Sequence, residues 1–325
     1  MTKKSIVWLL VTFLVANVSV AQAQQQAKIP RIGFLVASTL TLYSARIETF
    51  RQGLRELGYV EGKNIVIEYR FGEGKEDRLR ELAAELVSLK VDLIVAPATA
   101  RFAKDATKTI PIVFAATADP IATGLVDSLA RPGGNLTGLS IFAPELSGKR
   151  LELLKEAFPK IARVGFLWNP MSPSDPILLK ETETAAQGLG LKIQSLEVRA
   201  ASDFDRAFAA AKREGIHALS TSPHPLLNTN RARTLDFLSK NRLPAIFTNP
   251  ETVEEGGLMS YSPDYVEHFR RVAVMVDKIL KGTKPADIPV EQPMRFEFVI
   301  NLKTAKEIGL TIPPNLLVRA NRVIR

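Results

Sequence analysis

Small polar side chains stand where two short apolar runs of this chain end. The runs VDLIVA (91–96) and IPIVFAA (110–116) are rich in β-branched residues, which favours buried strands of a parallel sheet. Thr99 follows the first run, and Thr117 and Asp119 follow the second. Parallel sheets bind ligands beyond the carboxyl ends of their strands, where helix N-termini offer free N–H groups and a positive dipole. The threonines therefore suit an anion or a polar ligand, and Asp119 could accept a hydrogen bond from an amine.

Further candidates for ligand contact follow other predicted strands. The full set is Ser38, Thr39, Tyr43, Thr99, Thr117 and Asp119 in the first half, and Asn169, Ser172, Ser222, His224, Asn249 and Tyr261 in the second half. The hydroxyls of Ser38, Thr99 and Thr117 could bind a small carboxylate, because hydrogen bonds to a charged group contribute about 1.5–3 kcal/mol each. Tyr43 and Tyr261 could stack on a ring of the ligand.

Each candidate also has an ordinary structural role. Threonine and aspartate are common N-caps of helices, and helical patterns do begin at 101–107 and 121–129, directly after the two turns. The tyrosines could equally belong to the core, and His224, between two prolines, could be a loop residue. A single turn does not separate these roles, whereas several polar turns that face one cleft favour ligand binding.

The elements that carry these turns form two successive series of strands and helices. Predicted strands are 31–37, 64–69, 91–96, 110–116 and 136–142 in the first series, and 163–168, 191–198, 217–221 and 244–248 in the second. Predicted helices with an apolar face are 44–57, 76–89, 145–158, 177–189, 203–214 and 229–241. This alternation is typical of parallel sheets with helices on both faces.

The strands and helices that follow the second series indicate how the two α/β halves are joined. A short strand (257–261), a long helix (265–281), a strand (296–301) and a helix (302–308) follow the second series. Such elements predict that the chain crosses between the lobes more than once. The crossings would form a hinge of several segments, with a ligand cleft between the lobes.

The N-terminus has the pattern of a secretory signal. Lys3 and Lys4 precede the apolar run 6–20, and Ala21-Gln22-Ala23 follows it as a cleavage signal. We expect cleavage after Ala23 and a soluble mature chain, because the run is too short for a good transmembrane helix. An uncleaved anchor is the alternative. The chain has no cysteine, which excludes a lipid anchor at the N-terminus.

Composition argues against catalysis, metal binding and nucleic-acid binding. The chain has no cysteine, and its three histidines lie far apart, so no metal-site spacing appears. It has no G-x-S-x-G elbow and no P-loop. The net charge of +9 arises from basic residues that alternate with acidic ones, as on a solvated surface. We therefore expect a binding protein without cofactor, whose length suits two domains.

The sequence resembles a family of extracytoplasmic solute-binding proteins of ABC transporters, the one that includes proteins assigned to tryptophan or tyrosine. The stretches that carry the resemblance cover nearly the whole mature chain. They are 50–70, 82–96, 109–114, 124–140, 149–159, 256–264, 276–314 and 316–324, and they include FRQGLRELGYVEGKNIVIEYR, GLVDSLARPGGNLTGLS and VDKILKGTKPADIPVEQPMRFEFVINLKTAKEIGLTIPP.

The resemblance implies a type I periplasmic binding fold, with two Rossmann-like lobes joined by three crossover segments. The lobes would comprise 29–143 plus 257–285, and 144–256 plus 286–325. The protein would close around a small solute, either an amino acid, aromatic ones included, or another small carboxylate. It would then act as a monomer in the periplasm and deliver the solute to an ABC permease and its ATPase in the inner membrane.

Two alternatives remain, of which the first would have the same fold. A secreted sensor would pass ligand occupancy to a membrane receptor, and a Rossmann enzyme would need a nucleotide site that the sequence lacks. The turn after the third strand departs from the family pattern. Many members have Gly-Thr there, whereas this chain has Pro97-Ala98-Thr99-Ala100, without the glycine that lets a ligand approach the backbone closely.

Overall fold

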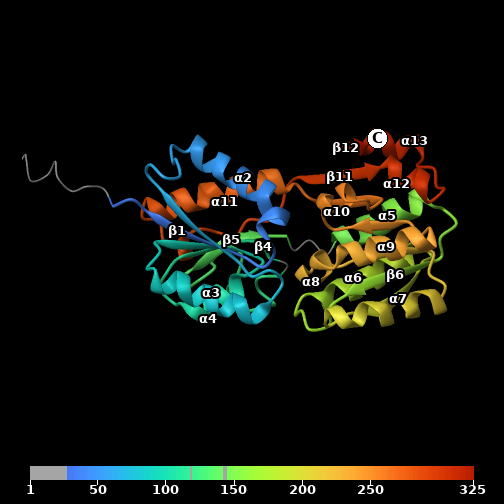
Figure 1. The fold of residues 1–325 in the computed structure, drawn as a ribbon, viewed down its shortest axis with the longest axis horizontal. Coiled ribbons are helices and arrows are strands. Elements are labelled where there is room, and N and C mark those ends of the chain that lie inside the picture. Colours follow the sequence, from blue (N-terminus) through green and yellow to red (C-terminus); the bar gives the residue numbers. More distant parts are fainter. Residues whose placement is uncertain (1–27, 118, 142–144) are drawn as a thin grey trace, which may run out of the picture.

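The computed structural model describes residues 28–325, apart from residues 118 and 142–144. The predicted secretory signal, Met1–Ala23, lies outside the described residues. The described chain forms two lobes side by side, each a sheet covered by helices (Figure 1). The α/β class with two Rossmann-like lobes is thereby confirmed.

Within the described residues, the first lobe contains a five-stranded parallel sheet in the order β2-β1-β3-β4-β5. Its strands are β1 (Arg31–Val36), β2 (Val66–Phe71), β3 (Leu93–Pro97), β4 (Ile112–Thr117) and β5 (Leu136–Ser140). Strands β1 and β3 are buried almost throughout, as expected for strands with helices on both faces. Because the strands are parallel, their carboxyl ends meet at one edge of the sheet.

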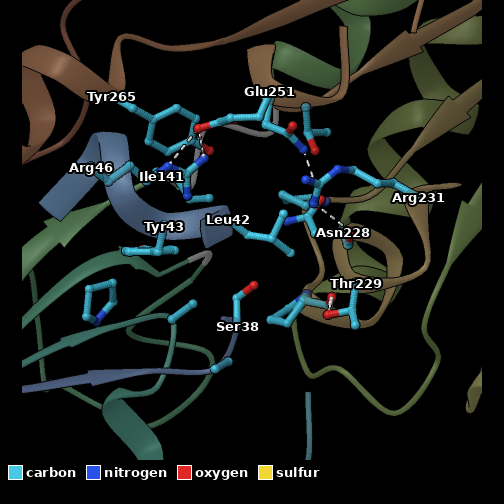
Figure 2. A pocket seen from close by; sticks show the side chains of 17 residues that line it. Ser38, Leu42, Tyr43, Arg46, Ile141, Asn228, Thr229, Arg231, Glu251 and Tyr265 are labelled. Atoms are coloured by element: carbon cyan, nitrogen blue, oxygen red, sulfur yellow. Dashed lines mark hydrogen bonds and ion pairs between the residues drawn. The ribbon is translucent and has the colours of Figure 1, made fainter. Parts of the chain in front are cut away.

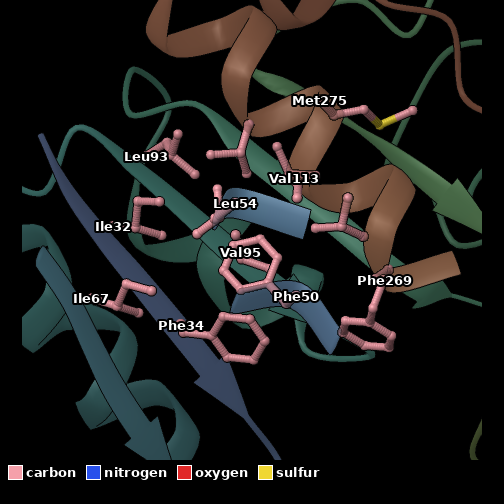
Figure 3. Close-up of a cluster of buried hydrophobic side chains, with 14 of the residues drawn as sticks. Ile32, Phe34, Phe50, Leu54, Ile67, Leu93, Val95, Val113, Phe269 and Met275 are labelled. Atoms are coloured by element: carbon pink, nitrogen blue, oxygen red, sulfur yellow. The ribbon is translucent and has the colours of Figure 1, made fainter. Parts of the chain in front are cut away.

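Helices cover both faces of this sheet. Helices α2 (Leu40–Glu56) and α11 (Tyr265–Leu280) lie side by side on one face, and α3 (Glu76–Ser88) and α4 (Ala100–Ala106) lie on the other (Figure 1). Phe34 of β1, Phe50 of α2 and Phe269 of α11 meet in the core under the first pair and are completely buried (Figure 3). Helix α11 follows β10 in sequence, so distant segments of the chain build this core.

The described part of the second lobe contains a seven-stranded sheet in the order β12-β11-β10-β9-β8-β6-β7. Its strands are β6 (Arg163–Trp168), β7 (Lys192–Glu197), β8 (Ala218–Thr221), β9 (Ala245–Phe247), β10 (Met259–Pro263), β11 (Phe296–Asn301) and β12 (Arg322–Ile324). Neighbouring strands are parallel, except that β10 and β11 are antiparallel. The carboxyl ends of β6, β8 and β9 therefore share one edge.

The helices of the second lobe also form two layers. One layer contains α5 (Glu145–Ala157), α6 (Asp175–Gly188), α12 (Leu302–Glu307) and α13 (Pro314–Arg319). The other contains α7 (Phe204–Arg213), α8 (Pro225–Thr229) and α9 (Arg231–Asn241). The short helix α10 (Pro250–Glu254) follows β9, and single 3₁₀ turns form at Ala201–Asp203 and Pro285–Asp287.

The chain passes between the two sheets after β5, between β10 and α11, and between Glu291 and β11. The predicted hinge of three segments is confirmed. At the second crossing, the Asp264 carboxylate accepts hydrogen bonds from the backbone N–H groups of Val266 and Glu267, at 2.9 and 3.1 Å. This N-cap begins α11 directly where the chain enters the first lobe.

The predicted lobe boundaries are wrong near two crossings. The sequence places 257–285 in the first lobe, but β10 pairs with β9 and β11 in the second sheet. The sequence places the chain from 286 onward in the second lobe, but the Ile288 carbonyl accepts a hydrogen bond from Thr137 Oγ1 of the first lobe at 2.7 Å. Strand pairing is decided by partners distant in sequence, and the local apolar pattern does not identify the sheet that a segment joins.

The helix predicted at 121–129 does not form. Residues 121–124 form turns, and Gly124 has a φ angle of 65°, outside the right-handed helical region. Asp119 does cap this segment, since its Oδ1 accepts hydrogen bonds from the N–H groups of Ile121 and Ala122. One capped turn therefore replaces the expected helix.

No helix among the described residues combines the length and the apolar character that a membrane span requires. The described His, Asp and Glu side chains form no group of three that could hold a metal ion.

Candidate functional site

A pocket lies between the two lobes at the carboxyl edges of both sheets (Figure 2). The first lobe contributes Ala37, Ser38, Leu42, Tyr43, Arg46, Pro97, Ala98, Ile141 and Tyr265, and the second contributes Pro223, Pro225, Asn228, Thr229, Arg231, Thr248, Asn249 and Glu251. Loops after β1, β3, β8 and β9 and the starts of α2, α8, α10 and α11 therefore converge on one space. This is the position at which open α/β sheets bind ligands.

An ion pair joins the lobes at this pocket. Arg46 of α2 donates from Nε to Oε1 of Glu251 in α10 at 2.9 Å, and its second terminal nitrogen lies 2.8 Å from the same oxygen. The Arg46 guanidinium also lies over two aromatic rings, 4.0 Å from the ring centre of Tyr265 and 5.2 Å from that of Tyr43. Cation–π contact and the carboxylate together hold the guanidinium in place.

The surroundings determine the charge states of this cluster. Burial alone would lower the pKa of Arg46, but Glu251 and the two phenols raise this pKa above its ordinary value. Burial raises the pKa of Tyr43 to about 12 and also raises the pKa of Tyr265. The arginine is therefore charged and both tyrosines are neutral at physiological pH.

Glu251 has one oxygen without a donor. Both contacts from Arg46 go to Oε1. Oε2 is buried, and no described residue donates a hydrogen bond to it. A buried carboxylate oxygen without a donor is costly, and Glu251 lines the pocket. The arrangement suits a ligand that brings a cationic N–H donor, such as an ammonium group.

Three of the predicted contacts line the pocket, namely Ser38, Tyr43 and Asn249. Asn249 is also an N-cap, since its Oδ1 accepts from the N–H of Thr252 at 2.9 Å. Its Nδ2 donates to Oδ1 of Asn228 at 2.9 Å, which ties α10 to α8. Thr39 precedes α2 as its N-cap residue, without a side-chain capping bond.

The turn after β3 brings a different residue to the pocket from the one predicted. Thr99 is fully buried, and its hydroxyl donates to the Leu35 carbonyl at 2.7 Å, which ties β3 to β1. Ala98 lines the pocket instead, with a φ angle of 57°. Glycine adopts this left-handed conformation easily, and an alanine there is strained and adds a Cβ beside the ligand space.

Two predicted residues at the end of β4 and just beyond it, Thr117 and Asp119, do not line the pocket. Asp119 caps the turn described above. The Thr117 hydroxyl is buried, and no described residue hydrogen bonds with it, whereas the backbone carbonyl of Thr117 accepts from Ile141 at 2.8 Å. A ligand role for either residue stays a prediction.

The residues predicted after β6 and β8 form a polar network inside the second lobe. The Ser222 hydroxyl donates to Asp175 Oδ2 at 2.6 Å, and the Asn169 backbone N–H donates to the same oxygen at 3.0 Å. Ser172 contacts Ser174 through their hydroxyls at 3.1 Å. His224 caps α8 by accepting from the N–H of Leu226 at 3.1 Å. These bonds shape the loop, and its prolines 223 and 225 reach the pocket.

Tyr261 belongs to the core of the second lobe. Its ring stacks on Phe296 with 5.8 Å between ring centres and packs against Phe298. It is partly buried beside the cluster under α5 and α12 and does not line the pocket. Of the two tyrosines predicted to face a ligand, the pocket includes Tyr43.

Sequence reasoning missed the charged half of the site. Arg46 lies one helical turn after Tyr43, so the spacing of three residues could have placed both on one face of α2. Glu251 lies two residues after Asn249, in the first turn of α10. No local signal marks Tyr265, because its position depends on the crossing that brings α11 back to the first lobe.

Next to this site, His268 of α11 predicts a dependence of stability on pH. The side chain is 3% exposed, and burial lowers its pKa to about 4. In the unfolded chain the histidine titrates near 6.5, so the unfolded state binds more protons below that pH. The stability due to the neutral histidine is complete above about pH 6.5 and is lost as the pH falls toward 4.

We expect the free energy of unfolding to fall by up to about 1.4 kcal/mol per pH unit within this window on account of His268. Urea unfolding at a series of pH values measures the slope. His268→Leu should flatten the slope, and the exposed His217→Leu serves as the control. An unchanged slope in His268→Leu would contradict the prediction.

Comparisons with known proteins agree with this architecture. A family model for ABC transporter substrate binding proteins matches residues 40–324. A tyrosine-binding protein of Clostridioides difficile is 28% identical over 263 residues, which are 80% of this chain and 75% of that protein.

Solved structures show the same fold. A conserved domain protein from Vibrio cholerae superposes with a TM-score of 0.85 at 28% identity, covering 91% of this chain and 100% of that one. The ABC domain from Streptococcus pneumonia in complex with L-Trp superposes with a TM-score of 0.84 at 27% identity, covering 91% and 99%. The fold is that of type I periplasmic binding proteins. The chain thus belongs to the family of ABC transporter substrate-binding proteins and is a binding protein, not an enzyme.

Proposed function

We propose that this protein binds an amino acid, with aromatic amino acids as the first candidates, in the pocket between its lobes. The observation that carries the proposal is the Arg46–Glu251 pair, which joins the lobes at a pocket beside two tyrosines and leaves one buried carboxylate oxygen without a donor. An ammonium group would satisfy Oε2 of Glu251. The relatives that bind tyrosine and L-Trp support the aromatic class.

The binding site consists of parts of both lobes, so ligand affinity and lobe closure are linked. A ligand that contacts both lobes shifts the population toward the closed arrangement, by as much as its affinity for that arrangement exceeds its affinity for the open one. In this proposal Glu251, rather than Asp119, accepts the amine, since Oδ1 of Asp119 already caps its own turn.

The proposed cellular role is delivery of the bound solute to an ABC permease and its ATPase. The chain would be exported through the signal at Met1–Ala23, cleaved after Ala23, and act as a monomer in the periplasm. N-terminal sequencing of the exported protein should give Gln24 as the first residue. Uptake of the labelled ligand should be lost when the gene is deleted, and it should be restored when the gene is reintroduced.

A thermal-shift screen of the mature protein tests the ligand class. Tyrosine, tryptophan, other amino acids, and the deaminated analogues of the two aromatic ones are compared. A ligand at about 100 times its Kd adds about 2.7 kcal/mol of stability, which raises the melting temperature by several degrees. We expect shifts with the aromatic amino acids. A shift of the melting temperature with the deaminated acids alone would refute the role of Glu251. The absence of a shift with every amino acid would refute the ligand class.

A further inference from the structure

Gly74 of the first lobe faces Thr229 of the second lobe beside the pocket. Gly74 lies in the loop between β2 and α3, and Thr229 is the last residue of α8. A Cβ atom placed on Gly74 would lie 3.2 Å from Cγ2, 3.7 Å from Oγ1 and 4.0 Å from Cβ of Thr229. The first distance is shorter than ordinary contact between carbon atoms. The lobes therefore approach each other here about as closely as a residue without a side chain allows.

This contact lies across the pocket from the ion pair that joins the lobes. Thr229 lines the pocket, and Figure 2 shows it on the side of Ser38, away from Arg46 and Glu251. The lobes thus meet on two sides of the pocket. On one side two charged side chains meet, and on the other a glycine faces a threonine.

Both sides of this contact are held in place by hydrogen bonds. The Gly74 N–H donates to the Ala37 carbonyl at 2.7 Å, which attaches the loop to the turn after β1. The Thr229 hydroxyl donates to the Pro225 carbonyl, one turn earlier in α8, at 3.0 Å. Because loop and threonine are both fixed, we expect a side chain at position 74 to displace one lobe relative to the other.

The backbone at position 74 would by itself favour glycine. Gly74 has a φ angle of 80°, in the left-handed region that glycine adopts easily. Asparagine also tolerates this region and brings a side chain. Gly62 of the same lobe has a φ angle of 81°, and no described atom lies within 4 Å of a Cβ placed on it. Asparagine at the two positions therefore separates the effect of the contact from that of the backbone.

We infer that Gly74 is a positioning residue for ligand binding, because its lack of a side chain lets the lobes close until Thr229 reaches the loop after β2. This inference rests on the proposed function and extends it to a residue that does not itself line the pocket. A side chain at position 74 would hold this side of the cleft apart. A ligand that must contact both lobes would then bind less tightly.

Calorimetry with tyrosine and tryptophan measures the effect of Gly74→Asn on affinity. We expect the affinity to fall by about five-fold or more, since an extra side chain at a close contact is unfavourable. Gly62→Asn is the matched control and should bind like the wild type. Without ligand, the two variants should have similar melting temperatures, because they share the backbone conformation. An equal affinity of the two variants would overturn the inference.

Thr229→Ala distinguishes a contact between the lobes from an effect of the loop alone. This substitution removes Cγ2 and Oγ1, the two atoms nearest to the added Cβ. Because Thr229 lines the pocket, Thr229→Ala has an affinity of its own and serves as a second background. In this background Gly74→Asn should have little further effect. The same loss of affinity in both backgrounds would overturn the inference.

A disulfide tests the contact without any ligand and without Gly74→Asn. The chain has no cysteine, and 4.0 Å between the two Cβ positions is within the range of disulfides. Oxidation of the double variant Gly74→Cys, Thr229→Cys should form an intramolecular disulfide, which mass spectrometry detects. Gly62→Cys, Thr229→Cys is the control and should stay reduced.

The same disulfide keeps this inference separate from the proposed ligand class. If neither aromatic amino acid binds the wild type, the ligand class is refuted, and the disulfide still decides whether the cleft closes at Gly74. A disulfide in the Gly74 pair alone would support the contact. Its absence from that pair, or an equal yield in both pairs, would overturn it.

Discussion

Replacing Glu251 with glutamine is expected to weaken amino-acid binding by about ten-fold or more. The variant loses the carboxylate that we assign to the ligand ammonium, and hydrogen bonds to charged groups contribute about 1.5–3 kcal/mol. It also leaves Arg46, whose side chain is 14% exposed, without the counter-ion from the opposite lobe. Both effects act in the same direction, because the ion pair joins the lobes that the ligand must bring together.

Two comparisons separate these effects. Glu254→Gln is the matched control, since Glu254 lies on the same helix α10 but pairs with Arg322 inside the second lobe. Calorimetry with tyrosine, tryptophan and their deaminated analogues then measures the contribution of the amine. If Glu251 accepts the amine, the variant loses affinity for the amino acids and not for the analogues. An equal loss for both would assign Glu251 to lobe closure alone, and no loss would contradict both roles.

Replacing Phe269 with alanine is expected to lower the free energy of unfolding by about 3–5 kcal/mol. Phe269 is completely buried between α11 and the first sheet (Figure 3). Its ring meets that of Tyr43 edge-on, with 5.9 Å between the ring centres. The substitution removes apolar contacts and leaves a cavity. Because whole domains are stable by about 5–15 kcal/mol, this loss is a large part of the total.

Urea unfolding followed by circular dichroism measures this loss. Val266→Ala is the control on the same helix, because Val266 is 54% exposed and its loss should change the free energy by about 0.5 kcal/mol or less. Ligand affinity of Phe269→Ala should fall as well, since the ring of Tyr43 loses the surface that fixes it beside the pocket. A midpoint equal to that of the wild type would contradict the assignment of α11 to the core of the first lobe.

Local sequence patterns determined most elements of the fold. The strand predicted at 163–168 corresponds to β6, and the one at 296–301 to β11, with the same bounds. The long helix predicted at 265–281 corresponds to α11, which ends one residue earlier. Such elements can be predicted from local sequence, because side-chain periodicity and helix caps act within one or two turns. The helix predicted at 121–129 does not form. In the sequence, a residue that caps a single turn cannot be told from one that starts a helix, and here Asp119 caps one turn and Gly124 has a positive φ.

The sequence also located the edge of the sheets at which the site lies. The predicted ligand contacts lie in polar turns at the ends of several strands, β4 and β6 included, and the pocket lies at the turns after β1, β3, β8 and β9. Within those turns, the sequence does not distinguish residues that bind a ligand from residues that cap a helix or join two strands. Thr99 ties two strands together, and Asn249 caps a helix while it also lines the pocket.

Only the tertiary structure decided which charges meet in the cleft. Arg46 and Glu251 are 205 residues apart in the chain, and their contact exists because the two lobes stand face to face. Burial and pairing depend on contacts between distant segments, and these contacts, unlike periodicity and caps, leave no mark in the local pattern of residues.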